Sequence, residues 1–188
     1  MPGPGDLHEL AEAILEEAVF ALDTIPDSDP SLLGSPDRAF ISPGVPVADF
    51  VGQDCCSQVA VWVSPTNEMD TFPGGNDIGK RSARYAWKNV VGFSIAVSRC
   101  IPTGSSSSVG IYSPPSADAL TEASRQHNAD HWALWNHMHN AVNAERILSI
   151  CDNVAIESIN AAIPSGGCAG WLMTMRAALD GYSEVLGT

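Results

Sequence analysis

Four histidines crowd one stretch of the chain and are the residues best suited to metal chemistry: His127, His131, His137 and His139. His127 and His131 are spaced i, i+4, which places two imidazoles on one face of a helix. The stretch reads HNADH, so the glutamate of an HExxH motif is absent, and helical rotation sends His137 and His139 to other faces. We therefore favour ordinary core or surface histidines. A small metal-dependent hydrolase that uses His127 and His131 is kept as an alternative.

The five cysteines match neither a disulfide framework nor the CxxC spacing of metal sites. Buried thiols that act as small hydrophobic residues are the default expectation. Cys55 and Cys56 precede one strand-like run and Cys100 ends the next, so a disulfide between these strand ends stays open as an alternative. Ser105–Ser108 lacks a GxSxG turn, and Gly74–Gly75 lacks the lysine of a phosphate loop. We expect no catalytic residue and no cofactor.

Charged side chains form two groups of opposite sign. Four of the nine Lys and Arg residues fall in one short segment: Lys80, Arg81, Arg84 and Lys88. Residues 6–24 have apolar side chains at helical spacing, and the other face of this predicted helix is acidic. Its candidate interface residues include Glu9, Glu12 and Glu16. For the acidic face, a solvated surface is the default interpretation and a docking face for a basic partner is the alternative. For the basic segment, clustering against an acidic background favours a protein contact over a merely solvated loop. The two groups are complementary in charge and are candidates for one contact.

Two strand-like runs form the centre of the predicted fold, Ser57–Ser64 and Val90–Arg99. In both, valine, isoleucine and phenylalanine recur at every second position, which is the period of a strand. Neighbouring runs of this kind pair as an antiparallel hairpin, here with a long basic loop over residues 65–89. Val154–Ile163 and Trp171–Leu179 alternate in the same way around a Pro/Gly turn, which predicts a second hairpin.

The rest of the chain connects these hairpins. Residues 1–5 form a Pro/Gly leader, expected to be mobile, and the five prolines of residues 25–54 predict an extended linker with at most a short strand at Val45–Val51. A second helix follows the N-cap Ser116 and runs to about residue 149. Residues 1–188 are thus predicted as a single α/β (α+β) domain. About four strands form a mostly antiparallel or mixed sheet flanked by two helices, in the order helix, hairpin, helix, hairpin.

The composition restricts the class of partner. With 22 acidic and 9 basic residues, the net charge of −13 opposes binding to nucleic acid phosphates. A hydrophobic content of 45% in 188 residues is enough for a buried core. No apolar stretch approaches the roughly 20 residues that span a bilayer, and no secretory leader is recognisable. We expect a protein made and assembled in a cytoplasm, with no membrane partner.

Four segments in series carry a resemblance to a known family: DCCSQVAVWVSP, VVGFSIAVSRCIP, ADHWALWNHMHNAV and IESINAAIPSGGCAGW. With the acidic first helix and the Pro-rich linker they cover residues 6–180. This series resembles the tail terminator proteins of long-tailed phages that infect actinobacteria. Its most specific parts are CCxQ…V paired with V.RC.P, and P-x-GGCAGW. Cys151 and the histidine-rich helix are not required by the family's pattern.

The resemblance implies an α/β domain with a mixed or antiparallel sheet flanked by helices. It also implies a ring of subunits, usually a hexamer, that caps the tail tube, ends tube polymerisation and presents a surface to the head connector. DNA would pass through the lumen without specific binding, and no catalytic residue is implied. The expected location is the neck of the virion tail, after assembly in the host cytoplasm. Another neck protein, such as a head-tail stopper, is the nearest alternative.

Overall fold

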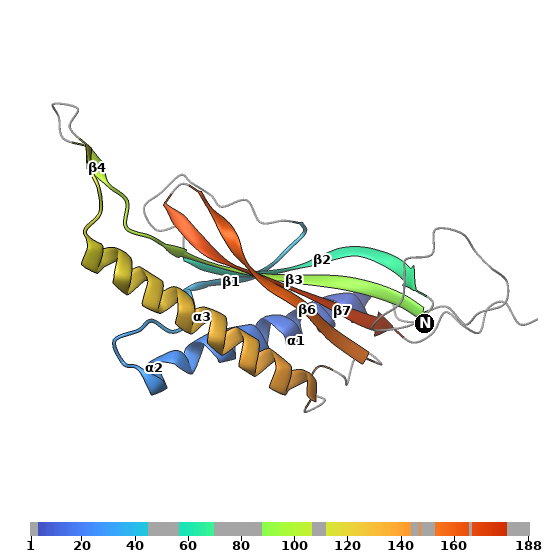
Figure 1. The fold of residues 1–188 in the computed structure, drawn as a ribbon. Helices are drawn as coiled ribbons and strands as arrows, with labels where there is room; N and C mark the ends of the chain where they lie inside the picture. Colours follow the sequence, from blue (N-terminus) through green and yellow to red (C-terminus); the bar gives the residue numbers. More distant parts are fainter. Residues whose placement is uncertain are drawn as a thin grey trace, which may run out of the picture.

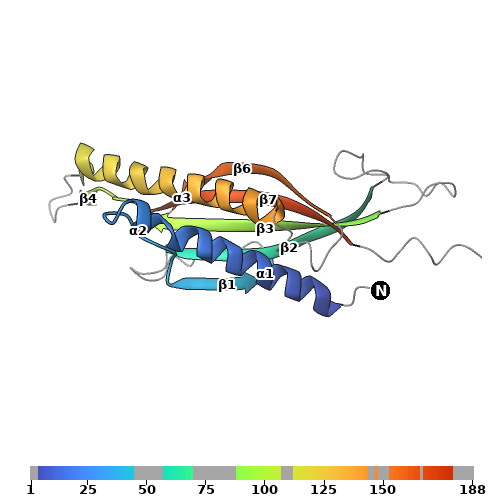
Figure 2. The same cartoon turned by 90° about the horizontal axis from the view of Figure 1, so that it is seen from below.

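The computed structural model describes residues 4–44, 57–69, 88–106, 112–143, 147, 153–165 and 167–179. Within them, a five-stranded sheet of order β1-β2-β3-β7-β6 carries two long helices on one face (Figures 1 and 2). The elements of this layer pair are α1 (Pro4–Asp23), β1 (Arg38–Ser42), β2 (Gln58–Met69), β3 (Lys88–Cys100), α3 (Ala117–Asn143), β6 (Asn153–Ser165) and β7 (Cys168–Leu179). The short helix α2 (Ile25–Ser28) follows α1, while β4 (Ser105–Ser106) and β5 (Tyr112–Ser113) form a separate two-stranded sheet.

The mixed α+β class is confirmed, and both predicted hairpins, β2–β3 and β6–β7, are antiparallel pairs. The sheet has a fifth strand, however, because β1 lies inside the predicted linker and pairs in parallel with β2. β2 and β3 also extend into the predicted loop over residues 65–89, of which residues 70–87 lie outside the described part of the chain.

Helix boundaries differ from the prediction by several residues. α1 begins at Pro4, within the predicted leader, and α3 ends at Asn143 rather than near residue 149. The N-cap of α3 is as predicted, since the backbone N–H of Ala119 donates to Oγ of Ser116 at 3.1 Å. The strand considered at Val45–Val51 falls outside the described residues. None of the described helices is long and apolar enough to cross a membrane.

The core lies between the helices and one face of the sheet. Alternate strand residues point to that face, as the period of two requires, and the helices contribute one stripe each. Its largest fully buried side chains include Leu10 and Ile14 of α1, Leu134 and Met138 of α3, and Phe93, Ile95, Met173 and Met175 of the sheet. Burial of each such side chain contributes about 1.5–3 kcal/mol, so the core fixes both helices on the same side of the sheet.

One glycine marks a place where two strands approach closely. A Cβ atom at Gly170, on β7, would overlap the carbonyl oxygen of Val97 on the neighbouring strand β3. The atom that it would meet belongs to the backbone of β3. Because the backbone cannot yield as a side chain would, we predict that Gly170→Ala lowers the free energy of unfolding by about 1–3 kcal/mol in a urea titration.

The matched control is Gly44→Ala, because no atom of the described residues lies within 4 Å of a Cβ built there. This variant should unfold within about 0.5 kcal/mol of the unmodified protein. Equal stability of the two variants would contradict the close approach at Gly170.

Candidate functional site

α1 forms the predicted acidic surface. Glu9, Glu12 and Glu16 are all exposed, on the side of the helix away from the buried Leu10 and Ile14. Among the described residues only His8 pairs with one of them, with Nε2 of His8 at 3.2 Å from Oε1 of Glu12. The helix contains no lysine or arginine. Its outer face is therefore negative, with no lysine or arginine from the described part of the chain to balance it.

The predicted basic group is placed only in part. Lys88 is the first residue of β3 and lies opposite Met69 in the β2–β3 ladder, so its assignment to a loop was wrong. The alternation seen in the sequence begins only at Val90, which is why the strand was expected to start later. Lys80, Arg81 and Arg84 lie outside the described residues. The structure thus places the acidic candidates and Lys88, and a contact between the two groups stays a prediction.

A histidine–carboxylate pair joins α1 to α3 beneath the acidic face. Nε2 of His137 lies 2.6 Å from Oε2 of Glu17, and both side chains are largely buried. The ring of Phe20 lies 5.0 Å from the His137 ring, measured between centroids. Glu17 therefore faces α3, unlike the exposed Glu9, Glu12 and Glu16 of the same helix.

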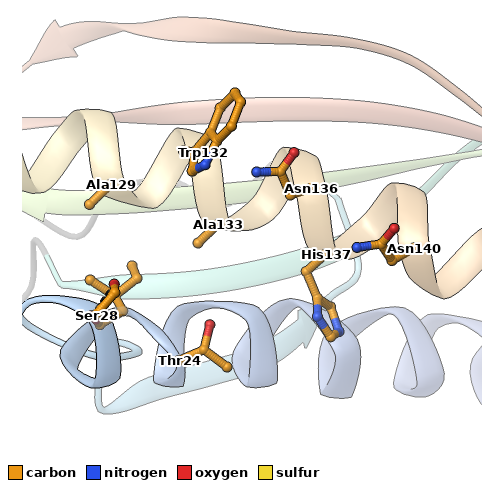
Figure 3. A pocket seen from close by; sticks show the side chains of 9 residues that line it. Thr24, Ser28, Ala129, Trp132, Ala133, Asn136, His137 and Asn140 are labelled. Carbon is orange, nitrogen blue, oxygen red and sulfur yellow. Dashed lines mark hydrogen bonds between the residues drawn. The ribbon is translucent and has the colours of Figure 1, made fainter.

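A groove of about 310 Å³ runs between α3 and the end of α1 with α2 (Figure 3). Its lining is mostly apolar and includes the hydroxyl and amide groups of four residues: Thr24, Ser28, Asn136 and Asn140. Trp132 belongs to the same lining, with 65% of its surface exposed. The lining thus combines hydrogen-bonding groups with an exposed tryptophan, and only the tryptophan is of a type enriched at protein interfaces.

A buried ion pair connects the sheet to the helix layer. Arg99, near the end of β3, donates from Nε to Oδ2 of Asp130 at 3.0 Å and from Nη2 to Oδ1 at 2.8 Å. The two side chains are only 6% and 0% exposed. Nη2 of Arg99 also donates to the carbonyl oxygen of Gly34 at 2.6 Å. This bidentate geometry is the strongest that arginine and carboxylate can adopt.

Neighbouring contacts extend this ion pair into the segment after α2. Nε2 of Gln126 donates to Oδ1 of Asp130 at 3.0 Å, and the Gln126 amide exchanges two hydrogen bonds with the backbone of Leu33. Arg125 is ion-paired with Asp29 at 2.6 Å on the exposed side. These residues were not among the candidates predicted from the sequence. A usable signal was present, because Arg99 continues the core-facing positions Val91 to Val97 of its strand.

The histidines considered for metal binding pack against an aromatic ring. The rings of His127 and His131 lie 5.7 and 4.7 Å from the Trp171 ring, and Trp171 Nε1 donates to the His127 carbonyl oxygen at 2.7 Å. His139 instead contacts Trp135 in an edge-to-face arrangement, with 4.3 Å between the ring centroids. In the described ranges no three His, Cys, Asp or Glu side chains are grouped to hold a metal. These contacts therefore give no support to the hydrolase alternative.

The cysteines differ from both expectations. Cys100 is a free, exposed thiol, so the disulfide considered between it and Cys55 or Cys56 is wrong. Cys168, which faces Cys100 across the β3–β7 ladder, is disulfide-bonded. The default of buried thiols is therefore wrong for both residues. Cys55, Cys56 and Cys151 lie outside the described residues.

The sheet face without a described helix holds a second hollow, of about 320 Å³. Small polar side chains line it, with Ser64 and Ser94 hydroxyls 3.3 Å apart. Nε of Arg176 lies 2.7 Å from Oε1 of Glu157 at its rim. Since these two charges pair with each other, the described lining of the hollow presents no unbalanced charge to a ligand.

No known family model matches this chain, and no curated protein matches it either. The chain is therefore not assigned to a family.

The buried ion pair makes a direct prediction. Asp130→Ala leaves the Arg99 guanidinium buried without its carboxylate, so it should lower the free energy of unfolding by about 3–5 kcal/mol. Replacing both partners, as Arg99→Met with Asp130→Leu, should cost less than the single change, because no buried charge is left alone. The measurement is urea unfolding followed by circular dichroism.

The exposed ion pair supplies the control for that prediction. Arg125→Ala removes the contact with Asp29, and exposed pairs contribute only about 0–1 kcal/mol. A cost for Asp130→Ala no larger than that for Arg125→Ala would contradict a structural role for the buried pair.

His127 predicts a pH dependence of stability. Burial lowers the pKa of His127 below its ordinary value of 6.5, Asp130 opposes this shift and Arg99 adds to it. Its Nδ1 is buried and lacks a hydrogen-bond partner among the described residues. The unfolded chain therefore takes up the proton first, so stability is full above about pH 6.5 and falls as the pH drops from there toward the lowered folded-state pKa.

The test compares the unmodified protein with His127→Phe between pH 7.5 and pH 5. The unfolding free energy of the variant should fall less steeply with decreasing pH, and an NMR titration should show the His127 ring protonating below its ordinary pKa. An identical slope for both proteins would contradict the prediction.

Proposed function

We propose that this chain is the subunit of a closed ring that caps the tail tube of a long-tailed phage and ends its polymerisation. The ring, expected to hold six subunits, would also present a surface to the head connector, as in the tail terminators that the sequence resembles. The observation that carries the proposal is the exposed acidic face of α1. Glu9, Glu12 and Glu16 find no lysine or arginine among the described residues.

The same chain contains a basic segment whose charge is opposite to that of the acidic face. Lys80, Arg81, Arg84 and Lys88 gather in one segment of a chain that has only nine Lys and Arg residues. Two different, complementary surfaces on one molecule produce head-to-tail contacts, and these close into a ring when the rotation per subunit divides a full turn. Charge complementarity of this kind sets the partner and the register of a contact.

The overall charge suits a channel for DNA. A net charge of −13 repels phosphates, so a ring of such subunits lets DNA pass without holding it. The mixed α+β fold with helices along the sheet is also compatible with the fold that the resemblance implies. The acidic and basic residues of this contact are proposed to act in assembly, and no catalytic role is proposed for any of them.

A charge-reversal experiment tests the proposal. Glu12→Lys with Glu16→Lys should abolish the ring, because like charges then meet at the contact. Arg81→Glu with Arg84→Glu should do the same, and combining all four changes should restore the ring. The measurements are the mass of the full chain in solution, by light scattering, and negative-stain images of the particles.

The control reverses two acidic residues elsewhere on the helix layer. Asp118→Lys with Glu122→Lys, in the first turns of α3, makes the same change in net charge and should leave the ring intact. Rings that persist in both reversed variants, or a full chain that stays monomeric at every concentration, would contradict the proposal. When isolated rings are added to growing tail tubes, the tubes should stop growing at the end that the ring caps.

A further inference from the structure

The sheet ends in two edges that no described strand covers. β1 forms one edge and β6 the other, as Figure 2 shows. The outer side of an edge strand presents backbone N–H and C=O groups that can pair with another chain. Proteins that remain monomeric protect such edges with charged side chains, prolines or bulges.

β6 has protective irregularities on both sides of a central stretch, but none within that stretch. Its ladder with β7 is irregular between Ile156 and Ser158 and again between Ala162 and Ser165. Residues 158–162 between these irregularities pair regularly with β7, contain no charge and no proline, and are exposed from Asn160 to Ala162. This stretch is therefore an open, regular edge.

β1 offers a matching stretch on the opposite edge. It has 5 residues, the same length as 158–162, and the ladders place the two stretches at the same level across the sheet. Ile41 lies opposite Val61, which continues through Ile95 and Met173 to Ile159. A second such row begins at Phe40 and ends at Asn160 through Ala60, Ala96 and Leu172.

The two edge strands also run in opposite directions. β1 is parallel to β2, and three antiparallel steps then lead from β2 through β3 and β7 to β6. A second copy set beside the first in the same orientation therefore meets β6 with an antiparallel β1. Side-chain faces agree as well, because residues in one row point to the same face of the sheet.

We infer that residues 158–162 of β6 pair with β1 of a second copy of this chain, as an antiparallel joint that continues the sheet from subunit to subunit. Ile159 would lie opposite Ile41 and extend the apolar row of the helix-covered face across the joint. Ala161 would lie opposite Ala39, and Asn160 opposite Phe40. Like charges directly opposite each other destabilise a strand pair, and none oppose each other in this register.

The joint is head-to-tail, since it uses a different edge of each subunit, and it closes if the sheets curve. It keeps the helix layers of all subunits on one side of the continuous sheet. The inference rests on the proposed ring and gives it a backbone geometry. It does not use the charged residues that the ring proposal invokes, so the two can fail separately.

Ala161→Lys tests the joint, because Ala161 is exposed and a lysine on an edge strand blocks pairing with another chain. The mass in solution should fall from that of the ring to that of the monomer. The variant should still unfold in a cooperative thermal transition, which shows that the subunit itself remains folded. Asn128→Lys, at an exposed position of α3, adds the same charge and should leave the ring mass unchanged.

A cross-link gives the second readout. Ala39→Cys and Ala161→Cys chains of different length, both carrying Cys100→Ser to remove the exposed thiol, are co-expressed and mildly oxidised. A reducible band joining one long and one short chain should appear, and should be missing when Asn128→Cys replaces Ala161→Cys.

The outcomes separate the two proposals. Rings that survive Ala161→Lys and give no cross-link overturn the strand joint and leave the charged ring contact standing. A cross-link that joins two Ala161→Cys chains to each other would show that β6 of one copy pairs with β6 of another. That result would also overturn the strand joint. A full chain that is monomeric throughout overturns both.

Discussion

The buried pair of Arg99 and Asp130 is the constraint on which the arrangement of the layers depends. It joins the end of β3 to the middle of α3, and its third hydrogen bond reaches Gly34 in the segment that leads from α2 to β1. A buried ion pair adds little net stability over apolar side chains of similar size, because removing two charges from water is costly. We interpret it as a device for specificity, since it is satisfied in a single arrangement of helix, sheet and returning chain.

That arrangement decides which surfaces the molecule shows. With α3 held over the β7–β6 side and packed against α1, the Glu17 carboxylate is used internally by His137, while Glu9, Glu12 and Glu16 remain outside. The segment returning after α2 then delivers β1 to the far edge of the sheet. The exposed acidic helix and the two sheet edges that no described strand covers are thus separate results of the same packing.

Much of this fold follows from residue periodicity, and the failures have identifiable causes. The hairpins were predictable because valine and isoleucine alternate, and α3 because Ser116 caps an amphipathic run. β1 was missed because it has 5 residues within a proline-rich segment, and its parallel pairing with β2 depends on tertiary contacts that no local pattern records. The burial of Asp130 was not predicted, although it shares the buried stripe of Leu134 and Met138.

The site was less predictable than the fold, because an interface is defined by what lies across it. The sequence shows that Glu9 and Arg81 differ in sign, but it cannot show that residues 38–42 and 158–162 lie at one level on opposite edges. That level is set by four successive ladders, and one shift of register in any of them would turn Ile159 to the other face. A sheet whose two edge stretches have the same length, lie at one level, run in opposite directions and share a face is suited to repetition. Because each joint would repeat one orientation, every α1 in the assembly would present its glutamates on the same side, and a single charged contact would then serve all subunits alike.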